Sequence, residues 1–188
     1  MEESDINLVR STLAGDARAF EVLVRRYQTL VLTVVLRTTG DQESARDLTQ
    51  DTFVKAYRAL KTFDQRRSFK AWLLSIASNA AIDLLRTRKN ALSLETILEE
   101  DPYLEPHSNA AAGNPEKEAE MNIFVGQLSW ALSLLPLRYR QAFVLRYQLD
   151  LTYEEISTVM KENENTVRTL LFRAKDRLRK LITSKVTL

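Results

Sequence analysis

Almost nothing in this chain interrupts a helix outside one short stretch, and this constrains its fold more than any other feature. The 188 residues include only four glycines and four prolines, and three of the prolines fall between Pro102 and Pro115. Because proline ends helices and glycine weakens them, so few of either favours long helices. We therefore expect an all-α protein, with two small helical domains on either side of the proline-rich stretch.

The residue types that are missing exclude several kinds of site. The chain has no cysteine and a single histidine, which excludes disulfides, thiolate metal sites and a cysteine nucleophile. It shows no glycine-rich phosphate loop, catalytic carboxylate pair or Ser/His/Asp set. We therefore expect a non-enzymatic protein without metal or cofactor. The apolar runs are far shorter than the roughly 20 residues that span a bilayer, which predicts a cytoplasmic location.

Charge is distributed unevenly along the chain. Residues 1–90 hold 15 Lys or Arg against 11 Asp or Glu, residues 91–120 hold one against eight, and residues 121–188 hold 11 against six. Two basic blocks, at +4 and +5, thus flank an acidic segment at −7. That segment has no apolar period, and we predict a flexible acidic linker over residues 91–120. The single histidine, His107, lies there and is assigned no role.

Apolar residues at steps of three and four predict three long helices before the linker. The first follows Asp16 and ends at Gly40. The second packs an apolar face between Ala45 and Leu60 and leaves a polar stripe on its other side. The third begins at Ser68 as its cap and ends in a basic cluster of Arg86, Arg88 and Lys89.

Four helices are expected after the linker. The first covers residues near 118–134, and the second covers residues 137–148 with Pro136 at its start. Thr152 and Glu155 form a capping box for a short third helix that ends at Met160. Asn163 caps a longer basic helix. A short helix, a tight turn and a longer basic helix make a helix-turn-helix pattern.

Two segments have side chains suited to nucleic acid. The first turns of the last helix carry polar residues that suit the major groove, namely Thr166, Arg168, Thr169 and Arg173. The segment 66–72 places Arg66, Arg67 and Lys70 beside aromatic rings, a combination that holds single strands. The rings, spaced three apart, equally suit a core. Basic blocks are also compatible with solvated helix faces, so a structural bundle with no DNA role stays open.

Five motifs, taken in order, resemble the extracytoplasmic-function (ECF) sigma factors of bacterial RNA polymerase. They are ARDLTQDTF at 45–53, SFKAWL at 68–73 with Asn79 and Asp83, LPLRYR at 135–140, YEEI at 153–156, and TVR with RAK at 166–168 and 173–175. The resemblance covers nearly the whole chain. It implies a first domain over residues 1–90 similar to sigma region two, and a second over residues 121–188 similar to region four.

The resemblance also implies partners for three sets of residues. Core polymerase would be bound by Asp47, Gln50, Asp51 and Lys55. The opened minus-ten element would be bound by Arg66, Arg67, Lys70, Trp72, Asn79, Arg86 and Arg88. The minus-thirty-five duplex would be bound by Asn165, Thr166, Arg168, Thr169, Arg173 and Lys175. An anti-sigma factor, in many cases membrane-anchored, is a further implied partner.

The chain departs from the family pattern at the helix-turn-helix corner. Lys161 and Glu162 stand where a glycine and an apolar residue are common, Asn165 replaces another glycine, and Leu170 replaces a frequent arginine. A left-handed lysine costs about 1 kcal/mol or more, so the corner geometry and minus-thirty-five affinity are open. The alternative function is a helix-turn-helix regulator that binds DNA without joining polymerase, and co-purification with core polymerase distinguishes the two.

Overall fold

The computed structural model describes residues 3–94 and 126–186, and every regular element within those two ranges is helical. Of the predicted linker, only residues 91–94 are described, and they belong to a helix. The rest of the linker, His107 and the start of the helix expected near residue 118 lie outside the described residues. No helix in the two ranges is both long enough and apolar enough to cross a membrane.

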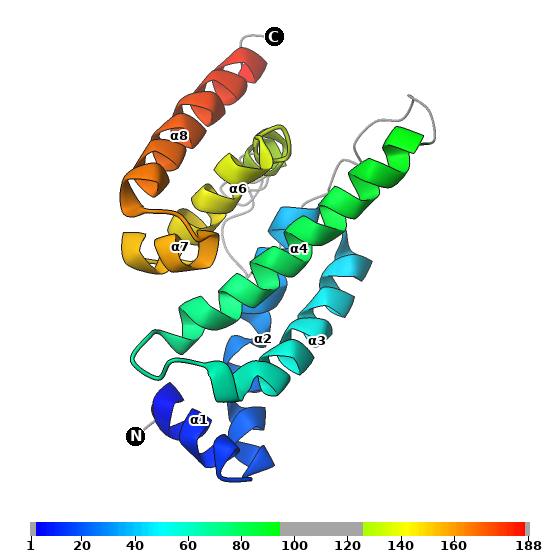
Figure 1. The fold of residues 1–188 in the computed structure, drawn as a ribbon. Helices are drawn as coiled ribbons and strands as arrows, with labels where there is room; N and C mark the ends of the chain where they lie inside the picture. The colour runs from blue at the N-terminus through cyan, green and yellow to red at the C-terminus, as the bar shows by residue number, and fades with distance from the viewer. Residues whose placement is uncertain (1–2, 95–125, 187–188) are drawn as a thin grey trace, which may run out of the picture.

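The first range is a bundle built around two long helices. Its elements are α1 (Asp5–Leu13), α2 (Ala17–Thr39), α3 (Gln42–Ala59), the 3-10 turn η1 (Leu60–Thr62) and α4 (Phe69–Leu94). Helices α2, α3 and α4 pack against one another pairwise, and α1 packs on α2 (Figure 1). Their shared core contains Leu23, Val31, Val34, Leu73 and Leu74, all of which are buried.

Local sequence signals determine where these helices begin and end. The Asp16 carboxylate accepts the Arg18 N–H at 2.9 Å to start α2, and Gly40, at a φ of 77°, ends it. The Ser68 hydroxyl accepts the Ala71 N–H at 3.2 Å to start α4. These predicted boundaries are confirmed. Helix α4 continues to Leu94, past its predicted end at Lys89, because no glycine or proline interrupts the residues that follow.

The second range contains the predicted helix-turn-helix. Residues 126–133 are helical and lead to α6 (Leu137–Phe143), the π-helical turn η2 (Val144–Gln148), α7 (Tyr153–Met160) and α8 (Glu164–Val186). The helix expected over 137–148 thus has a π-helical second half. The Thr152–Glu155 capping box is present, and Asn163 Oδ1 accepts the Thr166 N–H at 2.8 Å at the start of α8.

Lys161 ends α7 in the left-handed region, with a φ of 54° and a ψ of 43°. Its N–H donates to the Ser157 carbonyl, and the Glu162 N–H donates to the same carbonyl at 3.1 Å. The Glu162 carboxylate binds Arg138 of α6. The corner therefore keeps the geometry that glycine would favour, with a lysine in the strained position.

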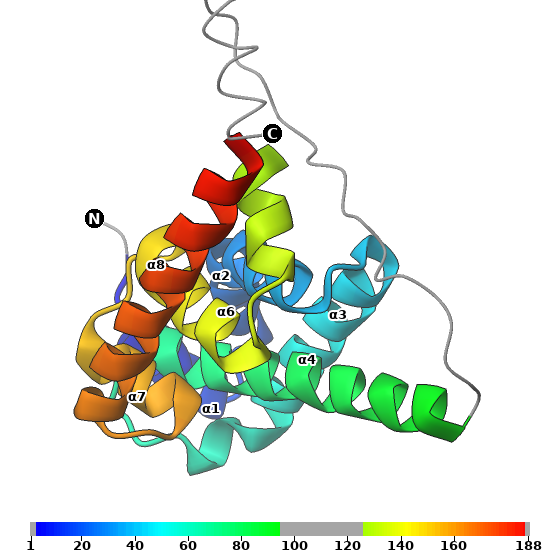
Figure 2. The same ribbon diagram turned by 90° about the horizontal axis from the view of Figure 1, so that it is seen from above.

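The two domains pack directly against each other. Helix α7 lies along α4, and α6 and η2 contact α2 (Figures 1 and 2). One continuous core cluster includes Leu73 and Leu74 of α4 together with Leu145, Ile156 and Val159 of the second domain. A smaller cluster joins residues 131–135 to Ala174 and Leu178 of α8. In this structure α4 therefore serves as a packing surface for both domains.

Arg88 links the C-terminal half of α4 to the start of α3. Asp41 caps α3 by accepting the N–H groups of Glu43 and Ser44, each at 3.3 Å, and Arg88 Nη2 donates to its Oδ2 at 3.0 Å. Hydrogen bonds from the Ser44 hydroxyl and from Arg88 lower the pKa of Asp41 to about 2. Arg88 has a structural partner in the first domain.

We predict that Lys161→Gly stabilises the protein, because glycine adopts the left-handed conformation without a Cβ clash. The expected gain in the free energy of unfolding is about 0.5–1 kcal/mol, after allowance for the greater freedom of glycine in the unfolded chain. Urea denaturation followed by circular dichroism measures it. Lys161→Ala removes the same side chain but retains the Cβ, and an equal gain in both variants would contradict the prediction.

We predict that Arg88→Ala destabilises the protein in a pH-dependent way. A carboxyl whose pKa is lower when folded adds stability above its unfolded pKa, and that stability disappears as pH falls through the folded pKa. The deficit of the variant should therefore be present at pH 5 and shrink as pH falls from about 4 through about 2.

Denaturation across that pH range measures the effect. Arg86→Ala is the matched control, because among the residues that the structure describes the Arg86 side chain pairs with the exposed Asp83, at 3.8 Å, and not with Asp41. A pH-independent deficit in Arg88→Ala, or the same deficit in both variants, would show that Asp41 is not its effective partner.

Candidate polymerase and nucleic-acid surfaces

Helix α3 has one buried and one exposed face. Ala45, Thr52, Phe53 and Ala56 are buried in the first-domain core. The four predicted polymerase-binding residues are all exposed: Asp47, Gln50, Asp51 and Lys55. Within the described residues, the three charged members of this set form no ion pair or side-chain hydrogen bond. We call this exposed side of the helix the α3 face, and its charges are available to a partner.

Sequence reasoning missed two apolar members of the α3 face. Val54 and Tyr57 are 48% and 51% exposed, and Tyr57 packs edge-on against Phe20 with ring centroids 5.0 Å apart. Gln50 also borders a hollow of about 330 Å³ between α2 and α3. Exposed apolar groups beside charges are typical of a surface that becomes buried in a complex. Helical spacing indicates the exposed position of Val54, since it lies one turn after Gln50.

Arg66 and Arg67 lie exposed in the turn before α4. Asp64 pairs with both, at 3.0 Å to Arg66 Nε and 3.6 Å to Arg67 Nε. Hydrogen bonds from Arg66 lower the pKa of Asp64, and the same contact raises the pKa of Arg66. Because exposed ion pairs contribute little to stability, a phosphate group can replace the carboxylate as partner of these guanidinium groups.

Trp72 is part of an aromatic cluster at the start of α4. Its ring centroid lies 5.0 Å from that of Phe63 and 5.6 Å from that of Phe69, and both of those residues are buried. Trp72 itself is half-buried. The spacing of three residues therefore places both rings in the core, as one of the two sequence interpretations expected. A stacking contact between Trp72 and a base stays a prediction.

The other predicted minus-ten residues lie along α4 in different surroundings. Lys70 is half-buried and donates to the carbonyl of Leu149 at 3.3 Å. Asn79 and Arg86 border a hollow of about 560 Å³ that residues of α6 and Lys161 close on the other side. Arg88 is held by Asp41 as described above. The structure thus places the half-buried Lys70 and Asn79 beside the second domain, while the Arg86 side chain stays exposed.

Helix α8 presents most of its predicted DNA residues to solvent. Asn165, Arg168, Thr169, Arg173 and Lys175 are exposed, and Thr166 is half-buried. The Arg168 guanidinium donates to Asn165 at 3.2 Å and to Glu164 at 3.1 Å, and it lies 5.4 Å from the ring centre of Tyr153. These contacts align the guanidinium along the first turns of the helix. We call this side of α8 the recognition face.

Two hydrophobic residues of α8 lie on different sides of the helix. Leu170 is only 9% exposed and belongs to the core cluster. Phe172, which sequence reasoning did not single out, is 74% exposed. It lies seven residues after Asn165, on the same side of the helix. The sequence did hold a signal for this exposure, because Phe172 falls outside the apolar stripe of α8. Lys175 lies at the edge of the recognition face, and its Nζ is 4.7 Å from the ring centre of Tyr147.

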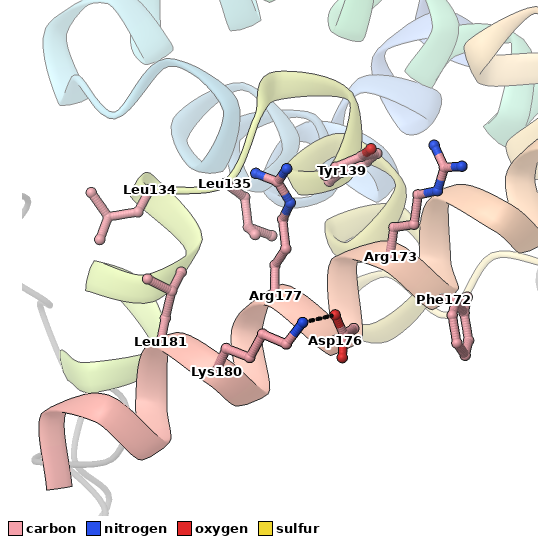
Figure 3. A pocket seen from close by; sticks show the side chains of 9 residues that line it. All are labelled: Leu134, Leu135, Tyr139, Phe172, Arg173, Asp176, Arg177, Lys180 and Leu181. Carbon is pink, nitrogen blue, oxygen red and sulfur yellow. Dashed lines mark ion pairs between the residues drawn. The ribbon is translucent and has the colours of Figure 1, made fainter. Parts of the chain in front are cut away.

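A hollow of about 630 Å³ adjoins the recognition face (Figure 3). Leu134, Leu135 and Tyr139 form one wall. The other wall is formed by six residues of α8, namely Phe172, Arg173, Asp176, Arg177, Lys180 and Leu181. The Arg177 guanidinium lies 5.4 Å from the Tyr139 ring centre, and Lys180 pairs with Asp176 at 2.8 Å. The hollow therefore combines an apolar wall with a basic rim.

Neither described range offers a metal site. No group of three or more His, Asp or Glu side chains there is placed to hold an ion. The chemistry of the exposed surfaces is that of charge pairing, hydrogen bonding and apolar contact.

Two protein-family models match the chain, each on one domain. The model of sigma-70 region 2 matches residues 23–91, and the model of sigma-70 region 4 matches residues 126–178. The first includes the α3 face and nearly all of α4. The second includes the helix-turn-helix and the recognition face.

Curated relatives resemble the chain along nearly its whole length. The RNA polymerase sigma-H factor of Pseudomonas aeruginosa is 33% identical over 183 residues, which cover 96% of this chain and 95% of that protein. The ECF RNA polymerase sigma-E factor of Salmonella typhimurium is 34% identical over 180 residues, which cover 92% and 91%.

Solved structures share the arrangement of the helices. CnrH in complex with the cytosolic domain of CnrY matches with a TM-score of 0.69 and 26% identity, over 97% of this chain and 99% of that one. The sigma factor RpoE of Bartonella quintana, in complex with the anti-sigma factor NepR, matches in fold with a TM-score of 0.73 and 20% identity, over 89% and 98%. Both family models in order, and relatives above 30% identity over more than nine-tenths of the length, show that the chain belongs to the extracytoplasmic-function sigma factors of bacterial RNA polymerase.

Proposed function

We propose that this sigma factor uses three separate surfaces on two domains. As a member of its family it binds core RNA polymerase, recognises promoter DNA and promotes the strand opening that begins transcription. In our proposal residues 1–90 hold the polymerase and minus-ten surfaces, and residues 121–188 hold the minus-thirty-five surface. Residues 91–120 connect them. The observation that carries the proposal is the α3 face. Its predicted charged residues are exposed and form no ion pair within residues 3–94 and 126–186, while the opposite side of α3 fills the core.

The polymerase contact is assigned to the α3 face. Its charges would pair with polymerase, and Val54 and Tyr57 would supply apolar area at the centre of the contact. The other predicted sets lie elsewhere: the minus-ten set follows the turn before α4 and α4 itself, and the minus-thirty-five set follows α8. Separate surfaces support a protein that holds polymerase and DNA at the same time.

The two DNA surfaces differ in the chemistry that they offer. The exposed guanidinium groups of Arg66 and Arg67, followed by Lys70 and Asn79, suit the phosphates and bases of an opened strand. The recognition face presents Arg168, Thr169 and Arg173 on one helix, which suits base edges in a major groove. Phe172 adds an apolar group that can contact thymine methyl groups.

The proposal includes the setting in which the protein acts. It has no catalytic activity of its own and works in the cytoplasm, where polymerase is. CnrH binds the cytosolic domain of CnrY, and RpoE binds the anti-sigma factor NepR. By analogy, we assign this chain an anti-sigma partner.

We predict that Gln50→Ala combined with Asp51→Arg abolishes co-purification with core RNA polymerase. Reversing one charge and removing one hydrogen-bonding group at the centre of the α3 face should weaken binding by at least tenfold. The control is Glu21→Arg on α2, an acid-to-arginine change at another exposed position. Circular dichroism checks that helical content is unchanged. Wild-type affinity in the α3-face variant would contradict the assignment and favour a regulator that does not join polymerase.

We predict that mutations on the two DNA surfaces have separable effects. Arg168→Ala and Arg173→Ala should each weaken binding to minus-thirty-five duplex, by about 1–3 kcal/mol where a bidentate base contact is lost. Arg67→Ala, Lys70→Ala and Asn79→Ala should impair binding to a pre-melted promoter by polymerase holoenzyme and leave duplex binding unchanged.

The measurement is binding to duplex and pre-melted templates across a salt series, because each lost phosphate contact reduces the salt slope. Loss on both templates by both groups of variants would indicate a single undivided DNA surface.

A further inference from the structure

The turn at residues 64–67, just before α4, is fixed at both ends by buried aromatic rings. Phe63 precedes the turn and Phe69 follows it, and their ring centroids are 5.5 Å apart. Trp72 packs against both rings, with centroid distances of 5.0 Å and 5.6 Å. Because the three rings form one packed cluster, the two ends of the turn cannot separate without opening the core.

Hydrogen bonds inside the turn fix its backbone. The Arg67 N–H donates to the Asp64 carbonyl at 2.9 Å, which closes a β-turn. The Asp64 carboxylate accepts the Arg66 N–H at 3.1 Å, as in an Asx turn. Gln65 and Arg66 are therefore the two central residues of a turn whose backbone is fixed, and only their side chains can adjust to a partner.

Helix α1 lies beside this turn and is itself held in place by the first domain. Its residues Leu8 and Val9 are buried in the core. Near its start, Asp5 accepts hydrogen bonds from Arg26, at 2.5 Å, and from the hydroxyl of Tyr27, both on α2. The helix also contacts η1, the element just before the turn (Figure 1). Helix α1 is thus a fixed support next to residues that we assign to the opened strand.

One hydrogen bond connects α1 to the centre of the turn. Arg10 Nε donates to Oε1 of Gln65 at 2.9 Å. Because a guanidinium group has donors and no acceptor, its partner must be the oxygen of the amide and not the nitrogen. The contact therefore sets which way the Gln65 amide is turned. Its oxygen faces α1, and its NH2 group lies on the other side.

The NH2 group is the part of Gln65 that is left for a partner. The residue is half-buried, and its amide nitrogen donates to none of the residues that the structure describes. Its neighbours along the chain are the exposed Arg66 and Arg67. The bases of an opened strand present their hydrogen-bonding edges. A donor that is fixed beside phosphate-binding cations is therefore placed to read one of these edges.

A donor in a fixed orientation discriminates among bases. Glutamine reads adenine with both amide atoms, because its oxygen accepts from N6 while its nitrogen donates to N7. Arg10 holds the Gln65 oxygen toward α1, which prevents this bidentate contact. A single donor still suits the carbonyl oxygens of guanine, thymine and cytosine. The arrangement therefore disfavours adenine at the position that Gln65 contacts.

We propose that Gln65 is a specificity-determining residue for the opened strand and that Arg10 is its positioning residue. The inference rests on the proposed minus-ten surface. Helix α1 precedes the residues that the sigma-70 region 2 model matches, which begin at residue 23. The contact gives this helix a part in promoter selection through the orientation of one amide group, without any contact between Arg10 and DNA.

The test uses core polymerase loaded with the full-length protein and a pre-melted promoter. The opened strand of the promoter is randomised at one position at a time, and sequencing of bound and unbound DNA gives the preference for each base. For the wild type we expect one position at which adenine is depleted at least about threefold. Gln65→Ala should remove that preference.

Arg10→Met keeps a side chain of similar length and removes its donors. The Gln65 amide should then turn freely, and adenine should be accepted at least about threefold better at the same position. Arg10→Lys should restore the wild-type preference, because Lys Nζ lies one bond further along the side chain than Arg Nε and still donates to the amide oxygen. The matched control is Arg18→Met, which removes one exposed charge on α2 and should leave the preference unchanged. Circular dichroism establishes that each variant folds.

Gln65→Glu tests the orientation while the contact with α1 is retained. A carboxylate still accepts from Arg10, but it turns an acceptor toward the strand in place of the NH2 donor. The preference should therefore shift toward cytosine and adenine, whose N4 and N6 amino groups donate.

An unchanged base preference in Arg10→Met or in Gln65→Ala would overturn the inference. So would a uniform loss of affinity for all four bases in Arg10→Met together with a smaller salt slope. That combination is the behaviour of a plain phosphate contact and not of a positioning residue.

Arg67→Ala and Lys70→Ala separate this inference from the proposed function. If both impair binding to the pre-melted promoter while Arg10→Met behaves as the wild type, the minus-ten surface stands and the role of Arg10 is wrong. If neither impairs binding, the proposed surface fails and the inference fails with it.

Discussion

Helix α4 is the element on which the rest of the structure depends, because both domains pack on it. It contributes Leu73 and Leu74 to the core of the first domain, and the same core cluster continues into Ile156 and Val159 of α7. Burying one such aliphatic side chain contributes about 1.5–3 kcal/mol. The helix also carries most of the residues assigned to strand capture. Packing and the proposed DNA contacts therefore involve neighbouring parts of one helix.

The distribution of charge has a physical consequence in this arrangement. Glu154 and Glu155 open α7, where negative charge stabilises a helix N-terminus, and they also border the hollow that contains Arg66 and Arg67. One pair of carboxylates thus supports a local helix start and offsets the positive charge of the neighbouring domain. The α3 face and the recognition face are exposed within the described residues.

Helix starts that depend on nearby residues were predictable from the sequence. Asp16, Ser68, Thr152 and Asn163 begin helices because each presents a side-chain oxygen to the next turn, and the spacing is visible in the sequence. The buried and exposed sides of α3 follow from helical period in the same way. The exposed position of Phe172 was predictable from the same period, because it falls outside the apolar stripe of α8.

Other features depend on residues far apart in the chain and could not be predicted by periodicity. In the sequence Arg88 looks like one more basic residue of a cluster. In the structure it binds Asp41, which lies 47 positions earlier. Gln141 and Ser78 share a buried hydrogen bond, although they are 63 positions apart and look like ordinary polar residues of amphipathic helices. Only the tertiary arrangement reveals these contacts.

The most direct test of this account is the distance between the two domains in the free protein. Because the chain has no cysteine, one spin label can be attached at Lys61→Cys in the first domain and another at Arg179→Cys on α8. Pulsed electron–electron double resonance then measures the distance between them. Because the two domains share one core cluster, the account predicts one narrow, short distance in the free protein. A broad distribution, or a long distance, would contradict it.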